Sequence, residues 1–188
     1  MSKQGYKKCD IPTLIPLAQG GDVKALEELI RRVQKHVYTM FSFLTNKNND
    51  VADLTQETLL KMARSLYQLK DPKNFHSWLN QIITNLFYDY ARKNSDKLIE
   101  FNQEKLNEIK DKIGCEPGER CLFSEIDKLI KAALMTLPKD LRLTIILREY
   151  EGLSYEDIAR ITNTAIGTVK SRISRARIKL QQELKDFI

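Results

Sequence analysis

The chain has 188 residues, 42% of them hydrophobic and 30% charged, and its formal net charge is +6. These values are typical of a folded protein with one large or two small domains, and they exclude a disordered or fibrous chain. The longest apolar runs are far shorter than the ~18 residues that cross a bilayer, and no secretory signal is visible at the N-terminus. We therefore expect a cytoplasmic protein without membrane insertion.

The charges divide the chain into two basic segments and an acidic connector. Residues 1–94 hold 14 basic and 9 acidic residues, residues 95–125 hold 5 and 8, and residues 126–188 hold 12 and 8. The connector also contains Gly114, Pro117 and Gly118, a cluster that is typical of a domain boundary. The sequence therefore predicts one domain over 1–94, an acidic linker over 95–125 and a second domain over 126–188.

Apolar residues at helical spacing predict three helices in the first segment, over residues 26–44, 54–66 and 78–90. The third follows the helix breaker Asp71-Pro72. Two more stripes, over 126–137 and 141–147, end at Pro138 and before Gly152. Because no segment alternates with a period of two, we predict an all-α fold of two small helical domains.

The segment after Gly152 has the pattern of a helix-turn-helix. Ser154 is a suitable N-cap, with Asp157 three residues later, and Asn163 tolerates the left-handed backbone that ends a helix. Thr164 is then expected to cap the next helix. The first helix has a short apolar face formed by Ile158, Ala159 and Ile161. The second has one expected buried stripe, formed by Ile166, Val169, Ile173, Ala176 and Leu180.

The second helix carries five basic residues between positions 167 and 180 and no acidic residue before Glu183. A helix face that only meets water usually mixes both signs in i,i+4 pairs. A membrane-binding helix would need bulky aromatic or leucine side chains on its opposite face, which here is mostly Ile, Val and Ala. Lysine and arginine on an exposed helix suit the phosphates and base edges of a DNA major groove.

No pattern in the sequence indicates catalysis. There is no glycine-rich phosphate loop, no metalloprotease motif and no nucleophile grouping. Cys115 and Cys121 are spaced unlike a zinc site, and an odd total of three cysteines without an export signal favours free thiols. We therefore expect a protein that is not an enzyme and has no cofactor, no metal and no catalytic residues.

Three quoted stretches resemble one family. "LMTLPKDLRLTIILREYEGLSYEDIARITNTAIGTVKSRISRARIKL" is similar to the C-terminal promoter-binding helix-turn-helix of bacterial RNA polymerase sigma factors, in particular the extracytoplasmic-function group of the sigma-70 family. "DVADLTQETLLKMARSL" and "FHSWLNQIITNLFYDYARK" resemble the N-terminal conserved domain of the same family. The resemblance covers residues 20–94 and 125–185 in the expected order.

The resemblance implies a dissociable subunit that binds core RNA polymerase, directs it to promoter DNA and helps to melt the minus-ten element. It also implies an anti-sigma factor as an inhibitory partner. The helix around residues 53–60 would dock on a coiled coil of the largest catalytic polymerase subunit, although its acids could equally compensate a helix dipole. The implied core polymerase contacts are Asp53, Leu54, Gln56, Glu57 and Leu60.

The same resemblance implies two sets of DNA contacts. The loop over residues 70–74 would hold a flipped base, and Asn85 would contact the adjacent strand. Trp78, Phe87 and Tyr90 fall on the apolar stripe of their helix, so we expect them in the core rather than on DNA. The implied minus-ten set is Lys70, Lys73, Asn74, His76, Asn85, Tyr88, Arg92 and Lys93. The implied minus-thirty-five set is Lys170, Ser171, Arg172, Ser174, Arg175, Arg177 and Lys179.

Two other kinds of function remain open at this point. The chain could be a freestanding helix-turn-helix DNA-binding transcriptional regulator, with the first domain as a sensor or dimerisation module. It could also be an interaction protein whose basic helix binds RNA. Binding to core RNA polymerase distinguishes the first hypothesis from both of these.

Overall fold

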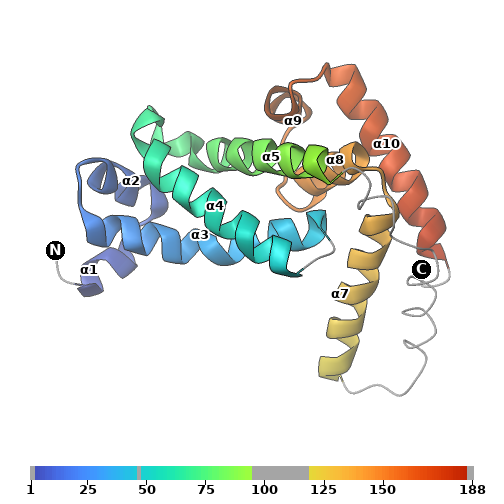
Figure 1. The fold of residues 1–188 in the computed structure, drawn as a ribbon, viewed down its shortest axis with the longest axis horizontal. Coiled ribbons are helices and arrows are strands. Elements are labelled where there is room, and N and C mark those ends of the chain that lie inside the picture. The colour runs from blue at the N-terminus through green and yellow to red at the C-terminus, as the bar shows by residue number, and fades with distance from the viewer. Residues whose placement is uncertain (1–2, 46–47, 95–118, 186–188) are drawn as a thin grey trace. The chain divides into compact units, whose positions relative to one another are not determined.

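A computed structural model describes residues 3–45, 48–94 and 119–185, with side chains described from residues 6, 49 and 126 onward in these ranges. The chain divides into two compact units, residues 1–41 with 47–89 and residues 42–46 with 90–188. Every regular element within the described ranges is a helix, which confirms the all-α prediction (Figure 1). Most of the predicted linker and Cys115 lie outside the described residues, so the predicted domain limits remain a prediction.

The first unit is built from helices that the sequence placed well and two that it did not predict. The expected helices over 26–44, 54–66 and 78–90 are present and begin earlier than predicted. The elements in chain order are α1 (Lys3–Lys8), α2 (Ile11–Gln19), α3 (Val23–Leu44), α4 (Asn48–Ser65), the 3-10 turns η1 (Leu66–Gln68) and η2 (Pro72–Asn74), and α5 (Phe75–Lys93).

Helix α2 is short and contains prolines, which explains why periodicity did not reveal it. Asp10 is its N-cap and accepts a hydrogen bond from the Thr13 backbone N–H at 3.0 Å. Pro16 lies inside the helix, where prolines are unusual. Leu14 and Ile15 are fully buried, so packing compensates for the weak helix propensity of this segment.

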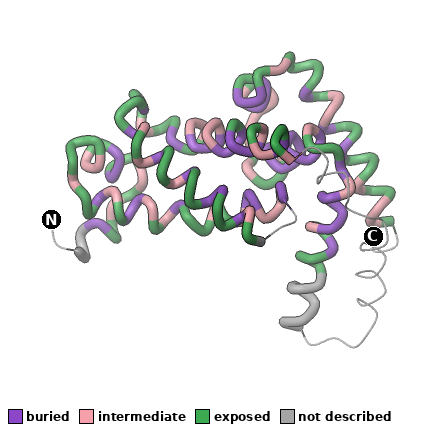
Figure 2. Tube along the Cα trace, viewed as in Figure 1, coloured by how far each residue is buried: buried purple, intermediate pink, exposed green. Residues whose placement is uncertain are grey.

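The core of the first unit comes from one face of each long helix (Figure 2). Leu29, Val33 and Val37 recur every four residues on α3 and are at most 3% exposed, as their spacing predicts. Met62 of α4 and Phe87 of α5 are fully buried. Each such burial contributes roughly 1.5–3 kcal/mol, so these side chains dominate the packing of the unit.

Polar groups fasten the N-terminal helices to α3. Asp22 accepts hydrogen bonds from the backbone N–H groups of Lys24 and Ala25 at the start of α3, and from the Tyr6 hydroxyl at 2.6 Å. Arg32 donates to the Tyr6 carbonyl at 2.9 Å, close to the C-terminal end of α1, where a cation is favourable. Hydrogen bonds from Arg31 and Arg32 lower the pKa of Glu28 to about 2, so this carboxylate is ionised at neutral pH.

The second unit is organised around α8, whose residues 141–147 are all buried. Its helices are α7 (Glu119–Thr136), α8 (Lys139–Glu149), α9 (Tyr155–Thr162) and α10 (Ile166–Glu183), and α9 and α10 both pack on α8. The guanidinium of Arg142 donates to the carbonyls of Met135 and Leu137 at 3.1 and 2.9 Å. Burial lowers the pKa of Arg142 to about 10, so the group stays charged and caps the end of α7.

Candidate polymerase and nucleic-acid interfaces

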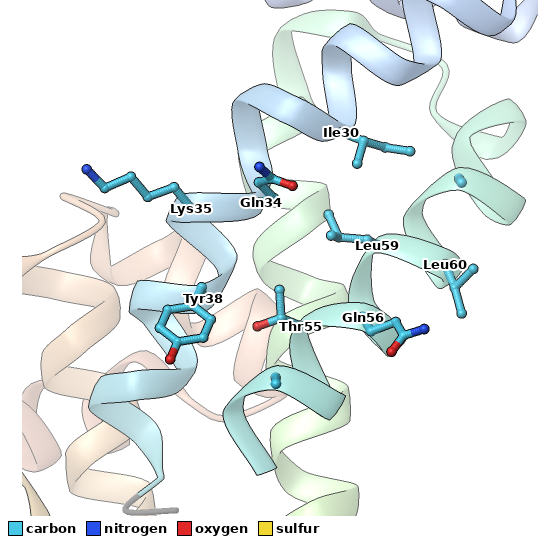
Figure 3. Close-up of a pocket in the computed structure, with 10 residues that line it drawn as sticks. Ile30, Gln34, Lys35, Tyr38, Thr55, Gln56, Leu59 and Leu60 are labelled. Carbon is cyan, nitrogen blue, oxygen red and sulfur yellow. The ribbon is translucent and has the colours of Figure 1, made fainter. Parts of the chain in front are cut away.

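An open groove of about 610 Å³ lies between α3 and α4, within the first unit. Its walls are mainly apolar, with polar atoms at the rim, and Figure 3 shows the side chains of both helices that line it. The lining residues are Ile30, Gln34, Lys35 and Tyr38 of α3 and Ala52, Thr55, Gln56, Leu59, Leu60 and Ala63 of α4.

Four of the five predicted polymerase contacts share one exposed face of α4. Asp53, Gln56, Glu57 and Leu60 recur at steps of three and one, which places them on neighbouring turns of the same side of the helix. Gln56 and Leu60 line the groove, and Leu60 is 48% exposed although it is a large apolar residue. Leu54 is separate from this face, because it is 6% exposed and packs in the core.

The α3 wall of the groove was not predicted. Ile30 falls on the apolar stripe of α3, yet it is only half-buried and lines the groove. Tyr38 is 44% exposed and lies on the same wall. Periodicity identifies a stripe but not where a neighbouring helix stops covering it, which is why the signal in the sequence was ambiguous.

The loop between α4 and α5, residues 66–74, turns the chain with its two leucines buried and its polar side chains outward. Leu66 and Leu69 are 3% and 6% exposed, whereas Lys70, Lys73 and Asn74 are all exposed. Asp71 caps η2 by accepting from the Lys73 backbone N–H at 3.0 Å. The structure therefore brings the three predicted loop contacts together on one exposed turn.

The predicted DNA contacts on α5 do not all share a face. Asn85, Tyr88 and Arg92 recur at steps of three and four, so they form one stripe, and Gln81 extends it through a 3.2 Å hydrogen bond to Asn85. His76 is about two and a half turns before Asn85 and therefore lies on the opposite side of α5.

The three aromatic residues expected in the core differ in their burial. Phe87 is fully buried, as expected. Trp78 and Tyr90 are only half-buried, so the expectation that they belong to the core describes only part of each side chain. Trp78 lies near Phe75, with ring centroids 6.0 Å apart, and Phe75 is 1% exposed. The Trp78 ring thus lies near the end of the α4–α5 loop.

The helix-turn-helix is present with most of its predicted caps. Ser154 Oγ accepts from the Asp157 backbone N–H at 3.0 Å, and the Ser154 hydroxyl donates to the Asp157 carboxylate at 2.6 Å. Asn163 has φ 50° and ψ 49°, the left-handed conformation expected of it. The expected cap at Thr164 is wrong. Helix α10 begins at Ile166 with Ala165 as N-cap, and the Thr164 hydroxyl pairs with that of Thr162 at 2.9 Å.

The buried stripe of α10 is shorter than predicted. Val169, Ile173 and Ala176 are buried, but Ile166 is 40% exposed and Leu180 is half-buried. Ile166 is the first residue of the helix, so the stripe that packs on the unit begins one turn later, at Val169. The stripe nevertheless fixes which side of α10 is turned toward solvent.

Two of the five cations on α10 form ion pairs with α8. Arg177 donates to Glu149 at 2.7 Å in an exposed pair. Arg172 lies 3.6 Å from Asp140, and its side chain is only 18% exposed. Lys170, Arg175 and Lys179 are exposed, and Arg175 donates to Ser171 Oγ at 3.3 Å. The exposed cations are therefore better placed to meet DNA than Arg172.

The described part of the chain contains no helix that is long and apolar enough to cross a membrane. Among the same residues, no group of three or more histidine, cysteine, aspartate or glutamate side chains is placed to hold a metal ion. The features that remain are an apolar groove with a polar rim, an exposed loop beside an aromatic helix, and a basic helix of a helix-turn-helix.

Comparison with known proteins assigns the chain to a family. Residues 29–97 match the description Sigma-70 region 2, and residues 127–180 match Sigma-70, region 4. Over 183 residues the chain is 34% identical to an ECF RNA polymerase sigma-E factor of Haemophilus influenzae, covering 93% of this chain and 95% of that one. The chain belongs to the extracytoplasmic-function group of the sigma-70 family. This sigma factor binds core RNA polymerase and directs it to promoters, as its resemblance to the family implied.

Further similarities agree with this assignment. The sigma factor is 32% identical to the ECF RNA polymerase sigma-E factor of Escherichia coli, over 93% of this chain and 94% of that one. A solved structure of the sigma factor RpoE with the anti-sigma factor NepR from Bartonella quintana aligns with a TM-score of 0.66 and 32% identity. It covers 88% of this chain and 100% of that one. The region 2 match begins inside α3, so α1 and α2 lie outside it.

Proposed function

We propose that this sigma factor docks on core RNA polymerase through the groove between α3 and α4. The observation that supports the proposal best is an apolar groove lined by Gln56 and Leu60, with the exposed carboxylates of Asp53 and Glu57 beside them on α4. An amphipathic helix with basic residues would bury its apolar side against Ile30 and Leu59 and direct its cations to Asp53 and Glu57. A coiled coil of the polymerase offers a helix of this kind.

Size-exclusion chromatography of the purified chain with core polymerase tests the docking site. Wild type is expected to co-migrate with core, and a Gln56→Ala/Glu57→Ala variant is expected to lose co-migration. A matched control, Glu27→Ala/Gln181→Ala, removes the same two functional groups from exposed positions outside the groove. Equal binding of both variants to core polymerase would show that the docking site lies outside the groove. No binding by wild type would favour a freestanding regulator.

We propose further that the α4–α5 loop and the Asn85 stripe of α5 capture the minus-ten element once it opens. Exposed Lys73 and Asn74 offer a cation and an amide at the loop, and Asn85 and Tyr88 offer an amide and an aromatic ring on the helix. Opening a duplex costs stacking energy, which such surfaces offset by holding the displaced bases. An Asn85→Ala variant should lower the permanganate reactivity of the opened element more than it lowers closed-complex binding. Unchanged reactivity would contradict this assignment.

The upstream promoter element is proposed to meet the N-terminal half of α10. Lys170, Ser171, Ser174 and Arg175 lie on or beside the side opposite the buried stripe, where a helix entering the major groove presents its base-reading residues. Lys179 and Arg177 lie farther along the helix and suit phosphates. Binding that loses sequence preference when Arg175 is removed would support this division of roles.

We also propose a protein inhibitor as a partner, a cytoplasmic location and no enzymatic activity. The structure of the Bartonella quintana relative was solved with an anti-sigma factor, which makes a similar partner reasonable for this chain. An inhibitor that covers the α3–α4 groove would prevent core polymerase from docking there. We expect core polymerase and a candidate inhibitor to compete for the wild-type chain. The Gln56→Ala/Glu57→Ala variant is expected to lose binding to both.

A further inference from the structure

Gln19 connects the unpredicted helix α2 to the α4–α5 loop. Its side-chain amide donates to the Leu66 carbonyl at 2.9 Å and to the Leu69 carbonyl at 2.8 Å. These partners are 47 and 50 residues away in the chain, at the start of η1 and just after its end. Gln19 is the last residue of α2, which lies outside the region 2 match.

Both partners of Gln19 are acceptors, so its NH₂ group has to face the loop. A carbonyl oxygen has no hydrogen to donate, and the two N–H bonds of one amide can satisfy two carbonyls. The Leu66 carbonyl also accepts from the Leu69 backbone N–H at 3.1 Å, which closes η1. Gln19 therefore contacts the loop at the point where α4 ends and the turn begins.

Packing holds both ends of this connection. Leu14 and Ile15 anchor α2 in the core, and Leu66, Leu69 and Phe75 anchor the loop from its inner side. Helix α2 contacts both η1 and η2. Beyond the second Gln19 bond only Lys70 separates Leu69 from Asp71, whose own hydrogen bonds shape η2. A shift of η1 would therefore also displace Lys73 and Asn74.

Energy favours a positioning role over a stabilising one. Gln19 is exposed as a residue, and hydrogen bonds that compete with water contribute little to the free energy of folding. The same two hydrogen bonds can still orient the loop. They end on carbonyls three residues apart, so they restrain both the position and the tilt of the turn between them. A recognition loop loses discrimination when its reading groups are displaced by a fraction of their contact distance.

We infer that Gln19 is a positioning residue that sets how the α4–α5 loop presents Asn74 and Lys73 to a base of the minus-ten element. The inference rests on the proposed role of that loop in minus-ten recognition. It assigns to α2 a part in promoter selectivity.

The variants follow from the donor geometry. Gln19→Glu keeps the size of the side chain but turns a carboxylate oxygen toward two carbonyls, which repels the loop. Gln19→Arg keeps donors without an acceptor and is expected to restore the contact. Gln68→Ala is a matched control. It removes an exposed amide of the same loop, and this amide donates a hydrogen bond only to the hydroxyl of the adjacent residue, Tyr67. Asn74→Ala serves as the reference for loss of the proposed base contact.

The experiment uses holoenzyme assembled from the full chain and core polymerase. A DNA library randomised over both promoter elements first defines the sequence preferred by wild type, and each variant is then tested on all single substitutions of the minus-ten part. Gln19→Glu is expected to reduce the preference at one base by about tenfold, which corresponds to ~1.4 kcal/mol. Gln19→Arg and Gln68→Ala are expected to keep the wild-type preference, and all four variants to keep wild-type core affinity.

Two outcomes overturn the inference and leave the proposed function standing. One is an unchanged preference in Gln19→Glu beside a lost preference in Asn74→Ala. The other is an equal loss in Gln19→Glu and Gln19→Arg together with lower melting temperature and core affinity, which would make Gln19 structural. If Asn74→Ala itself keeps the wild-type preference, the loop does not read a base, and the proposed minus-ten role fails together with the inference.

Discussion

Two short connections in this sigma factor are proposed here to present residues toward DNA, and they are held in different ways. The turn of the helix-turn-helix, residues 162–165, is shaped by its own neighbours: Asn163 and Thr164 donate backbone bonds to Arg160 and Ala159, at 3.3 and 3.0 Å. The α4–α5 loop depends in part on Gln19, at least 47 residues away. A locally held turn can be anticipated from sequence, whereas a remotely held loop becomes visible only in the folded chain.

The largest expected effect tests whether the local turn aims α10 at bases. Arg175→Ala should weaken promoter binding by about 1–3 kcal/mol, selectively at one upstream position, because a lost bidentate contact removes discrimination there. Lys179→Ala is the control and should weaken binding to all sequences alike through a lost phosphate contact. Binding titrations on a set of singly substituted promoters measure both. A uniform loss in Arg175→Ala would reassign it to the DNA backbone.

The next prediction breaks the local turn itself. Asn163→Val should destabilise the second unit by about 1–2 kcal/mol, since a branched L-residue is strained at φ 50°. Asn163→Gly should cost nothing measurable, because glycine adopts this conformation freely. Denaturant unfolding followed by circular dichroism distinguishes them. Equal stability of the two variants would show that the turn is not held by its left-handed residue.

A smaller effect is expected from the local half of the α4–α5 loop. Asp71→Ala removes the acceptor of the Lys73 backbone N–H and should cost about 1 kcal/mol, as for the loss of a helix N-cap. Asp71→Asn keeps an acceptor oxygen and should retain most of that stability. If both variants melt like wild type, remote contacts such as that of Gln19 hold the loop without local help.

The smallest effect concerns the ion pair between α8 and α10. Glu149→Gln breaks the exposed pair with Arg177 and should change the free energy of unfolding by less than about 0.5 kcal/mol, because exposed pairs are screened by water and salt. Arg177 would then be free to meet a phosphate, so DNA affinity should rise slightly at low salt. A loss of stability above 1 kcal/mol would show that this pair organises α10.

Several site features could be predicted from sequence because their causes are close together in the chain. Ser154 and Asp157 form a cap three residues apart, and Asn163 has the backbone tolerance that its position needs. The cap at Thr164 was wrong by one residue, since helix starts depend on where the new helix packs. The ion pair of Arg172 also depended on packing, because its partner Asp140 is distant in sequence.

The sequence by itself determined the helical class, the long helices, the basic character of α10 and the resemblance to the family, because periodicity, capping and charge are properties of neighbouring residues. Only the tertiary structure decided that the apolar stripe of α3 opens into a groove at Ile30 and Tyr38, and that Gln19 of α2 reaches the α4–α5 loop. Burial and hydrogen bonds between distant segments arise from how helices pack, and a short stretch of sequence does not determine that packing.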